Sequence, residues 1–440
     1  MKRIISILLL LAVSVSLCAC FLDPAESLYA VPKQSDDYNN LQSAIEAAMP
    51  DGASYSPPVS GDNQQAVQMI DLDGDGADEA IVFMKTSAAA PMLLSVFQKQ
   101  DDRFVLLSKI EGAGSAFGQV QYIKFDDRPG YEIALGRQIS DQVLQILSVY
   151  TLVDGGLVEL GSANYSHCIT DDLNADGLQD IVVIRSDVEG QRGIAELYHW
   201  GQGQLLRERE ALLSTNATAV KRVISGNVYE KRRAVFVAQE YGEGGIITDI
   251  FTFRGGVFSN ISSSDETGTS VSTVRDYYVY SSDIDGDGLI ELPQIIPLPE
   301  IEGDENSKSQ SLVQWFNLST DGKQENKALT YYNHAAGWYL DIENSWKTTL
   351  CVTRGQSPGA SPSYEFYLAD AQMLLSIASV TGEDAAQQIE EAGWTVLTQK
   401  GDVYYACLLG LSGERLRLSY EEIRAMFHFI HEDWKTGETG

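Results

Sequence analysis

The chain has 440 residues, of which 44% are hydrophobic and 21% charged, a composition typical of globular proteins rather than of disordered or fibrous ones. This length exceeds one ordinary domain, so we expect two or more folding units or an array of repeats. The 31 lysines and arginines face 62 aspartates and glutamates, and the formal net charge is −31. This balance argues against nucleic acid as a partner, because phosphate binding needs a basic surface, and it suits divalent cations.

Residues 1–20 have the organisation of a secretory signal peptide. Lys2 and Arg3 precede an apolar run over residues 4–17, which is too short to span a bilayer as a permanent helix. The segment ends in Leu17-Cys-Ala-Cys20, which resembles the bacterial lipobox. That resemblance implies cleavage before Cys20, lipidation of its thiol, and a mature protein held outside the cytoplasm on the bacterial cell membrane by its lipid anchor. The alternative is an ordinary signal peptide.

Residues 21–60 carry no repeat and are interrupted by prolines, so they are expected to form a tether. Within them, the stretch from Leu41 to Met49 predicts one short helix. Beyond Cys20 three cysteines remain, and an odd number excludes a complete disulfide framework. Cys351 and Cys407 could pair, or all three could be buried free thiols, which pack as small apolar residues.

Three acidic segments repeat one pattern, with oxygen-bearing side chains at positions 1, 3, 5 and 9 and a glycine at position 6. Alternate carboxylates in a tight turn point several oxygens at one centre, and the glycine permits the sharp reversal. Carboxylates this close need a cation to stay ionised together, and Ca²⁺ is a natural choice. The side chains are Asp71, Asp73, Asp75 and Glu79; Asp172, Asn174, Asp176 and Asp180; and Asp283, Asp285, Asp287 and Glu291.

These segments are not EF-hands. An EF-hand loop has a bidentate glutamate at position 12 and flanking helices. Position 12 here is Val82, Val183 or Gln294. A short apolar, partly β-branched run follows the first two segments, which predicts a buried strand after the loop.

A second period of about fifty residues accompanies the loops. Five aromatic residues each end an alternating strand before a polar or glycine-rich turn, at intervals of 53, 48, 53 and 65 residues. Repeated hairpins with this period predict a propeller or a similar radial array of units with roughly four strands each, in which the acidic loop joins the first two strands. The residues are Phe97, Tyr150, Tyr198, Phe251 and Phe316.

Together these features resemble the FG-GAP/VCBS repeats of integrin-α-type β-propellers, over about residues 61–330. The resemblance implies a mainly β fold with a β-propeller of about five blades. It also implies about three structural Ca²⁺ sites, bound by the side chains at positions 1, 3, 5 and 9 and by the carbonyl at position 7. Those carbonyls belong to Ala77, Leu178 and Leu289.

The second and fourth units depart from the pattern. Phe125 to Glu132 and Ser225 to Arg233 have lost the alternating carboxylates and gained basic residues. One hypothesis is that Arg128 and the run from Lys231 to Arg233 replace the positive charge of the metal in these units. The alternative is a degenerate turn with solvated basic residues.

The period stops near residue 331, and residues 331–440 predict a small, separate α+β domain. A helix is expected over residues 382–392, ended by Gly393. A final helix is expected after the capping box of Ser419 and Glu422, with apolar residues at helical spacing as far as Trp434.

No coherent catalytic set emerges, and we predict no enzyme. Ser357 lies in a GxSxG pattern, but Pro358 has no N–H to donate to an oxyanion. The favoured function is a non-enzymatic, calcium-stabilised lipoprotein that binds an extracellular protein or carbohydrate. The alternatives are an envelope assembly scaffold and, less favoured, a polysaccharide hydrolase or lyase.

Overall fold

The computed structural model describes residues 36–87, 91–139, 145–186, 190–276, 279–356, 361–368 and 372–430. The predicted signal segment, Cys20 and the start of the tether lie outside these residues. Among the helices that the structure does describe, none has the length and apolar character needed to cross a membrane.

The described chain is mainly β, and its first seventeen strands, β1 to β17, form four antiparallel sheets in chain order, which we call units 1 to 4. Each unit is a meander in which neighbouring strands are joined directly, and a short strand β1 adds to unit 1. The strands of units 1 and 2 are β1 (Ser54–Tyr55), β2 (Val67–Ile70), β3 (Glu79–Lys85), β4 (Met92–Gln100) and β5 (Arg103–Gly112), then β6 (Ala116–Ile123), β7 (Glu132–Gln138), β8 (Gln145–Val153) and β9 (Gly156–Tyr165). Those of units 3 and 4 are β10 (His167–Asp171), β11 (Asp180–Arg185), β12 (Ile194–Gly201) and β13 (Gln204–Leu212), then β14 (Val220–Val228), β15 (Arg232–Tyr241), β16 (Gly245–Arg254) and β17 (Val257–Asn260).

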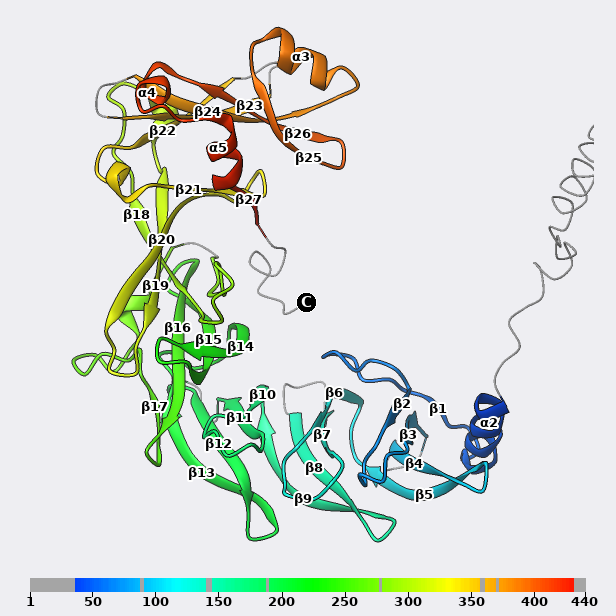
Figure 1. Cartoon of the computed structure of the whole chain (residues 1–440). Helices are drawn as coiled ribbons and strands as arrows, with labels where there is room; N and C mark the ends of the chain where they lie inside the picture. The colour runs from blue at the N-terminus through cyan, green and yellow to red at the C-terminus, as the bar shows by residue number, and fades with distance from the viewer. Residues whose placement is uncertain are drawn as a thin grey trace, which may run out of the picture.

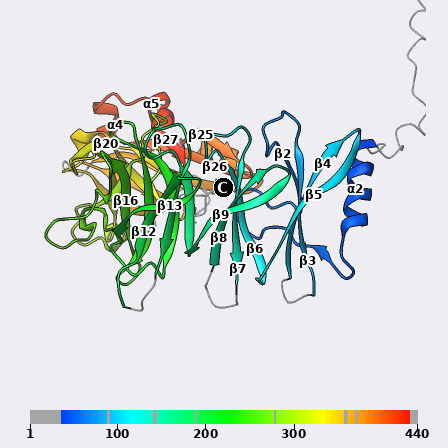
Figure 2. The ribbon, with the colours of Figure 1, turned by 90° about the horizontal axis from the view of Figure 1, so that it is seen from below.

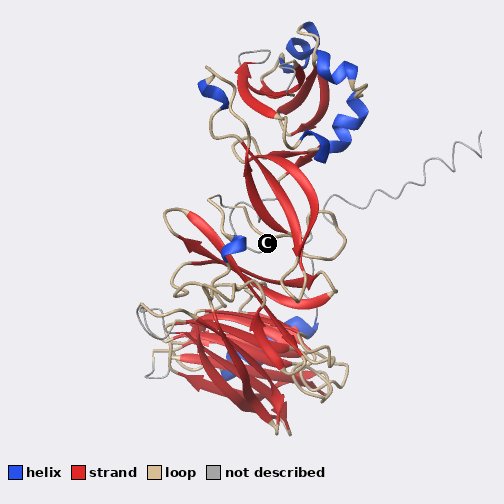
Figure 3. Cartoon of the chain, turned by 90° about the vertical axis from the view of Figure 1, so that its left-hand side faces the viewer, coloured by secondary structure: helices blue, strands red, loops and turns tan. Residues whose placement is uncertain are grey.

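Two further sheets follow, unit 5 and a terminal sheet. Unit 5 comprises β18 (Leu292–Pro297), β19 (Ser311–Leu318), β20 (Gln324–Asn333), β21 (Trp338–Asp341) and, from the end of the described chain, β27 (Phe427–Phe429). The terminal sheet comprises β22 (Cys351–Gln356), β23 (Pro362–Tyr367), β24 (Met373–Thr381), β26 (Val403–Leu409) and β25 (Thr395–Lys400), in that spatial order. The helices are α2 (Asp36–Ala48), α3 (Ala385–Glu391), α4 (Leu411–Arg415) and α5 (Tyr420–Met426). Figure 3 shows strands throughout the molecule, with α3, α4 and α5 gathered around the terminal sheet.

The fifty-residue period corresponds to a repeated strand register. In units 1, 2, 3 and 5 the residue after loop position 9 pairs with the aromatic residue of the period, and a β-bulge lies beside that aromatic residue in the next strand pair. The pairs are Ala80↔Phe97, Ile133↔Tyr150, Ile181↔Tyr198 and Leu292↔Phe316. The bulges lie where β4 pairs with β5, β8 with β9, β12 with β13 and β19 with β20. The prediction of units with about four antiparallel strands each is therefore confirmed.

Successive units pack face to face, and the hydrophobic core lies between them. One apolar cluster joins unit 1 to unit 2, where the Phe83 and Phe117 rings meet edge to face with centroids 5.1 Å apart. Similar clusters join unit 2 to unit 3, unit 3 to unit 4, and unit 4 to unit 5. Figure 1 shows the five units following one another along an arc, and Figure 2 shows their sheets side by side from below.

The other face of unit 1 is covered by α2. Alternation along β3 sends Ile81 and Phe83 toward unit 2 and sends Ala80, Val82 and Met84 toward the helix. The helix buries Ile45, which is 2% exposed, against this face. The short helix predicted at residues 41–49 is therefore confirmed.

The C-terminal region differs from the sequence-based expectation. Residue 331 lies inside β20, and unit 5 continues to β21 and includes β27. The last helix ends at Met426 rather than continuing through Ile430, so that prediction was wrong. Phe427 and Phe429 alternate with His428 and pack on the core between unit 5 and the terminal sheet, and pairing with β21 outweighs the helical spacing. The helix expected at residues 382–392 is confirmed as α3, whereas Trp434 lies outside the described residues.

The three cysteines that the structure describes, Cys168, Cys351 and Cys407, are free thiols. Cys351 lies on β22 and Cys407 on β26, and these strands are not neighbours in the terminal sheet. Burial raises the pKa of Cys407 to about 12. Free thiols rather than a disulfide are therefore observed.

Candidate metal centres

The three acidic segments form loops that lead into β3 of unit 1, β11 of unit 3 and β18 of unit 5. The position-1 carboxylate organises each turn by accepting backbone hydrogen bonds. Asp71 accepts from the N–H groups of Gly74 (2.6 Å) and Gly76 (3.0 Å), and Asp283 accepts from the same two positions, Gly286 (2.7 Å) and Gly288 (3.0 Å). In unit 3 the donors to Asp172 are the N–H groups at positions 5 and 6, Asp176 (3.1 Å) and Gly177 (3.0 Å).

The position-6 glycine makes this turn possible. Gly76, Gly177 and Gly288 have φ angles of 90°, 90° and 84°, in the region that side-chain-bearing residues rarely adopt. The sharp reversal predicted from the sequence is therefore confirmed in all three loops.

The position-9 carboxylate is buried beneath each loop and accepts a hydrogen bond from the N–H of position 2. Glu79, Asp180 and Glu291 are 0%, 3% and 0% exposed. Their partners lie at 2.8 Å (Leu72), 3.0 Å (Leu173) and 3.0 Å (Ile284). Each loop therefore closes over an acid that water does not solvate.

Burial raises the pKa of these acids. It raises the pKa of Asp180 and of Glu291 to about 7 each, and neighbouring loop carboxylates add to the effect of burial, while the backbone hydrogen bond opposes it. The pKa of Glu79 is raised for the same reasons. In Glu291, the Oε1 atom is buried and has no hydrogen-bond partner. A carboxylate oxygen in this state points to a cation as its missing partner.

Two of the loops bring three carboxylates together. Asp71, Asp73 and Glu79 each offer an oxygen within 4.8 Å of the others, and Asp283, Asp285 and Glu291 do the same in unit 5. These clusters could hold a metal ion, because several hard oxygen ligands converge on one point.

The loop of unit 3 is organised differently. Its third position is the amide Asn174, whose Nδ2 donates to Asp176 Oδ2 at 2.8 Å. The amide thereby satisfies a carboxylate oxygen that in a more acidic loop would need a cation. We therefore expect this loop to carry a lower negative charge than the other two.

Positions 5 and 7 of the loops bond to each other. The N–H groups of Ala77, Leu178 and Leu289 donate to the position-5 carboxylates at 2.7, 2.8 and 2.8 Å. Those carboxylates belong to Asp75, Asp176 and Asp287. The position-7 residues thus fix the position-5 side chains.

Two side chains from neighbouring strands reach the loops and were not predicted. Gln98 on β4 donates to Asp73 Oδ2 (3.1 Å) and to Glu79 Oε1 (3.4 Å). Lys327 on β20 places its Nζ 2.9 Å from Asp287 Oδ2. Gln98 directly follows the aromatic Phe97 of the period, which could have indicated it, whereas the place of Lys327 depends on a bulge that the sequence pattern does not show.

Unit 2 keeps two hydrogen bonds of the acidic loops and supplies its own cation. Phe125 N–H donates to Glu132 at 2.9 Å, with the seven-residue spacing of the acidic loops, and Arg128 N–H donates to Asp126 Oδ1 at 2.7 Å. The Arg128 guanidinium also donates to Asp126 Oδ2, with Nε at 2.8 Å. Asp126 and Glu132 are 1% and 2% exposed. The sequence-based expectation that Arg128 neutralises this unit therefore agrees with the contacts observed.

In unit 4 the corresponding prediction was wrong. Val228 pairs with Arg232 across a tight turn, so no nine-residue loop is present between β14 and β15. Arg233 instead forms an ion pair with Asp171 of unit 3, with Nε and Oδ1 2.9 Å apart. Arg233 thus joins units 3 and 4, while Arg232 donates to Phe253 O within unit 4.

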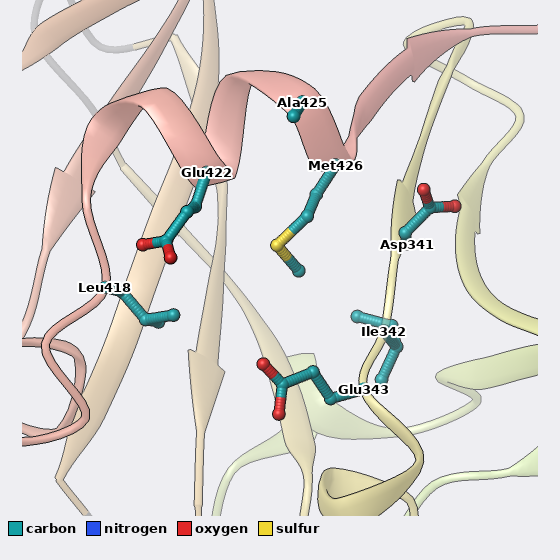
Figure 4. A pocket seen from close by; sticks show the side chains of 7 residues that line it. All are labelled: Asp341, Ile342, Glu343, Leu418, Glu422, Ala425 and Met426. Carbon is teal, nitrogen blue, oxygen red and sulfur yellow. The ribbon is translucent and has the colours of Figure 1, made fainter.

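A separate groove of ≈ 390 Å³ lies between α5 and the segment that follows β21. Figure 4 shows Glu422 and Met426 extending from α5, with Glu343 on the opposite segment. Glu422 accepts hydrogen bonds from Ser419 N (2.8 Å) and Oγ (2.9 Å), which lower its pKa. At the edge of the groove, Asp341 Oδ2 lies 3.0 Å from His428 Nε2. Ser357, which lies in the GxSxG pattern, is outside the described residues.

Comparisons with known proteins give only distant structural similarity. No protein-family model matches the chain, and no curated protein matches it. The rhamnogalacturonan lyase YesX has a TM-score of 0.30 and 11% identity, covering 81% of this chain and 75% of its own. A Bacillus licheniformis rhamnogalacturonan lyase has a TM-score of 0.27 and 13% identity, covering 72% and 71%. An exo-β-1,3-galactanase from Phanerochaete chrysosporium has a TM-score of 0.25 and 10% identity, covering 74% and 79%. Because every one of these TM-scores is low, we carry none of these activities over to this chain.

Proposed function

We propose that this chain is a calcium-stabilised β-propeller lipoprotein that binds an extracellular protein or carbohydrate without catalysing a reaction. Units 1 to 5 would be the blades, and the loops of units 1, 3 and 5 would hold structural Ca²⁺. Cys20 would carry the lipid that anchors the protein outside the cell membrane.

The observation that carries the proposal is the shared hydrogen-bond register of the three loops. In each, a position-1 carboxylate is bound by backbone N–H groups and a buried position-9 carboxylate closes the loop from below. Two of the loops bring three carboxylates within 4.8 Å of one another, and the third loop has the same register with Asn174 in place of one acid. Repetition of an arrangement that is unfavourable without a cation supports a common ligand.

The chemistry of the donors favours Ca²⁺ over other metals. The candidate ligands are carboxylate, amide and backbone oxygens, without a histidine or cysteine among the predicted set, and hard divalent cations prefer oxygen. The flexible, many-oxygen loops suit the larger Ca²⁺ better than Mg²⁺, which demands strict octahedral geometry. When bound, the cation would neutralise the loop and lock the hairpin that follows it.

The arrangement of the sheets supports the blade assignment. Units 1 to 5 are antiparallel meanders, each packed face to face on the next, and units 1, 2, 3 and 5 share a common register. Propellers are built in this way, from about four-stranded sheets repeated radially. A scaffold of this kind presents loops for recognition, which is consistent with binding rather than with chemistry.

The test is thermal unfolding of the chain lacking residues 1–20, in excess EGTA and in millimolar Ca²⁺, with calorimetric counting of sites. We expect a large rise in Tm with Ca²⁺ and about three sites. Asp73→Asn should remove one site, whereas Asp127→Asn, in the loop of unit 2 and exposed, should remove none. Absence of binding and of any Tm shift would refute the structural calcium sites.

The binding role needs its own measurement. A glycan array and a pull-down from intact envelopes would separate a carbohydrate ligand from a protein partner or an assembly scaffold. Depolymerisation of any polysaccharide in a panel by the purified protein would contradict the non-enzymatic assignment.

A further inference from the structure

Lys327 contacts the acidic loop of unit 5 from a neighbouring strand. Its Nζ lies 2.9 Å from Asp287 Oδ2, and the side chains of the pair are 24% and 34% exposed. Hydrogen bonding to Asp287, with the fields of Asp285 and Glu291, raises the pKa of Lys327. The ammonium group is therefore held by Asp287 and stabilised by the charge of the loop around it.

A β-bulge sets the place of this lysine. Phe316 pairs with Asn326 and Trp315 with Ala328, so Lys327 is the extra residue of the bulge. The same bulge in units 1, 2 and 3 contains Leu107, Leu160 and Glu208. Among these four equivalent positions, a positive charge occurs in unit 5 alone.

The lysine does not satisfy the loop completely. Its ammonium group contacts Asp287, whereas Glu291 Oε1 is buried without a hydrogen-bond partner. The oxygen atoms of this loop could therefore still bind a further cation. Because about a quarter of the lysine side chain is exposed, its long flexible stem can carry the charge into solvent when another cation arrives.

We infer that Lys327 is the resident counter-cation of the unit 5 loop and is displaced when a divalent cation binds there. This inference rests on the proposed function, because it requires that loop to bind metal. Displacement breaks the Lys327–Asp287 pair and leaves the positive ammonium group near the positive metal ion. The lysine therefore lowers the metal affinity of unit 5. In unit 1 the side chain that reaches the loop from a neighbouring strand is Gln98, which bonds to Asp73 and Glu79, is neutral and exerts no such competition.

Calorimetric titration of the full chain with CaCl₂ tests the inference. We expect Lys327→Met to raise the affinity of one site roughly tenfold and to leave the other sites unchanged. Lys323→Met is the matched control, because Lys323 lies in the turn before the same strand, pairs with Asp321 at 2.9 Å and is 82% exposed. Unchanged affinity at every site in Lys327→Met, with about three sites still present, would overturn the inference and leave the proposed function intact. No calcium binding in the unaltered chain would overturn both.

A second measurement uses the unaltered protein, so it does not depend on the folding of a variant. The lysines are acetylated with a limiting amount of an amine-reactive reagent, once in EGTA and once in CaCl₂. The labelling of each lysine is then measured by mass spectrometry. We expect labelling of Lys327 to increase several-fold with CaCl₂, while labelling of Lys323 stays constant. Equal labelling of Lys327 in both conditions, in protein that binds calcium, would show that the ion pair persists and would refute displacement.

Discussion

At the scale of the residue, the acids at position 9 are subject to opposing effects on their protonation. Burial favours their protonated form, while a backbone N–H and, in the proposed state, a metal ion favour the carboxylate. An acid with a pKa raised by folding binds more protons in the folded than in the unfolded protein. Protonation therefore stabilises the metal-free fold, fully so below the unfolded pKa, and this stabilisation is lost as the pH rises through about 7.

We expect the metal-free protein to be more stable at pH 5 than at pH 8. Asp180 and Glu291, whose model-peptide pKa values are 3.8 and 4.5, both rise to about 7, and each should contribute roughly 2 kcal/mol to the difference. Urea unfolding in EGTA at the two pH values measures it. Glu291→Gln, which resembles the protonated acid, should reduce the pH dependence, and saturating Ca²⁺ should abolish or reverse it. A stability that rises steadily from pH 5 to pH 8 in EGTA would contradict this account.

At the scale of the element, the loop of unit 2 shows that two hydrogen bonds of the acidic loops form with a different counter-charge and with Pro129 in place of the position-6 glycine. It keeps the bond from position 2 to position 9 and the bond from position 5 to position 3, but position 5 is Arg128. Because the cation is part of the chain, this unit needs no metal. EGTA should therefore not weaken this unit, because EGTA cannot remove an arginine side chain.

Arg128→Met should therefore destabilise the protein in a way that calcium does not restore. The substitution leaves the fully buried side chain of Asp126 without its ion pair, and loss of one partner of a buried pair is costly. Because Arg128 is 37% exposed, water can replace part of the interaction, and we expect a loss of about 2 kcal/mol. Urea midpoints in EGTA and in Ca²⁺ measure it. Lys109→Met, which breaks an exposed pair with Glu111, is the control and should change the midpoint little. Recovery of Arg128→Met by calcium would argue that the unit 2 loop is itself a metal site.

Elements of this kind also show what a sequence can and cannot specify. The acidic loops were predictable because their ligands and glycines are close in sequence, and the period of aromatic residues revealed the strand register. The contacts of Gln98 and Lys327 come from other strands, so they depend on register and on a bulge. The end of α5 was mispredicted because Phe427 and Ile430 satisfy helical spacing, while the open edge of β21 offers hydrogen bonds that only the folded sheet provides.

At the scale of the whole molecule, the units form a linear series in which each sheet depends on its neighbours for burial. The apolar clusters lie between units rather than within them, so an isolated unit would expose much of its core. Ion pairs and backbone contacts between adjacent loops, such as Arg233 with Asp171 and Lys124 O with Gln179 N at 2.7 Å, follow the same order. Metal binding in one loop should therefore stabilise the adjoining units as well.

The net charge of −31 acts on this series as a whole. Mutual repulsion of so many carboxylates destabilises the compact state, and salt screens it over about 10 Å at 0.1 M and less at higher concentrations. We expect the Tm in EGTA to rise between 20 and 500 mM NaCl, and to rise less in saturating Ca²⁺, because the bound cations already neutralise the densest groups of charge. Choline chloride should match NaCl if screening is responsible, whereas an effect of sodium alone would indicate that Na⁺ occupies the loops. Equal salt effects with and without calcium would mean that repulsion is spread over the surface, and the loops would then not be the main electrostatic weakness of the metal-free fold.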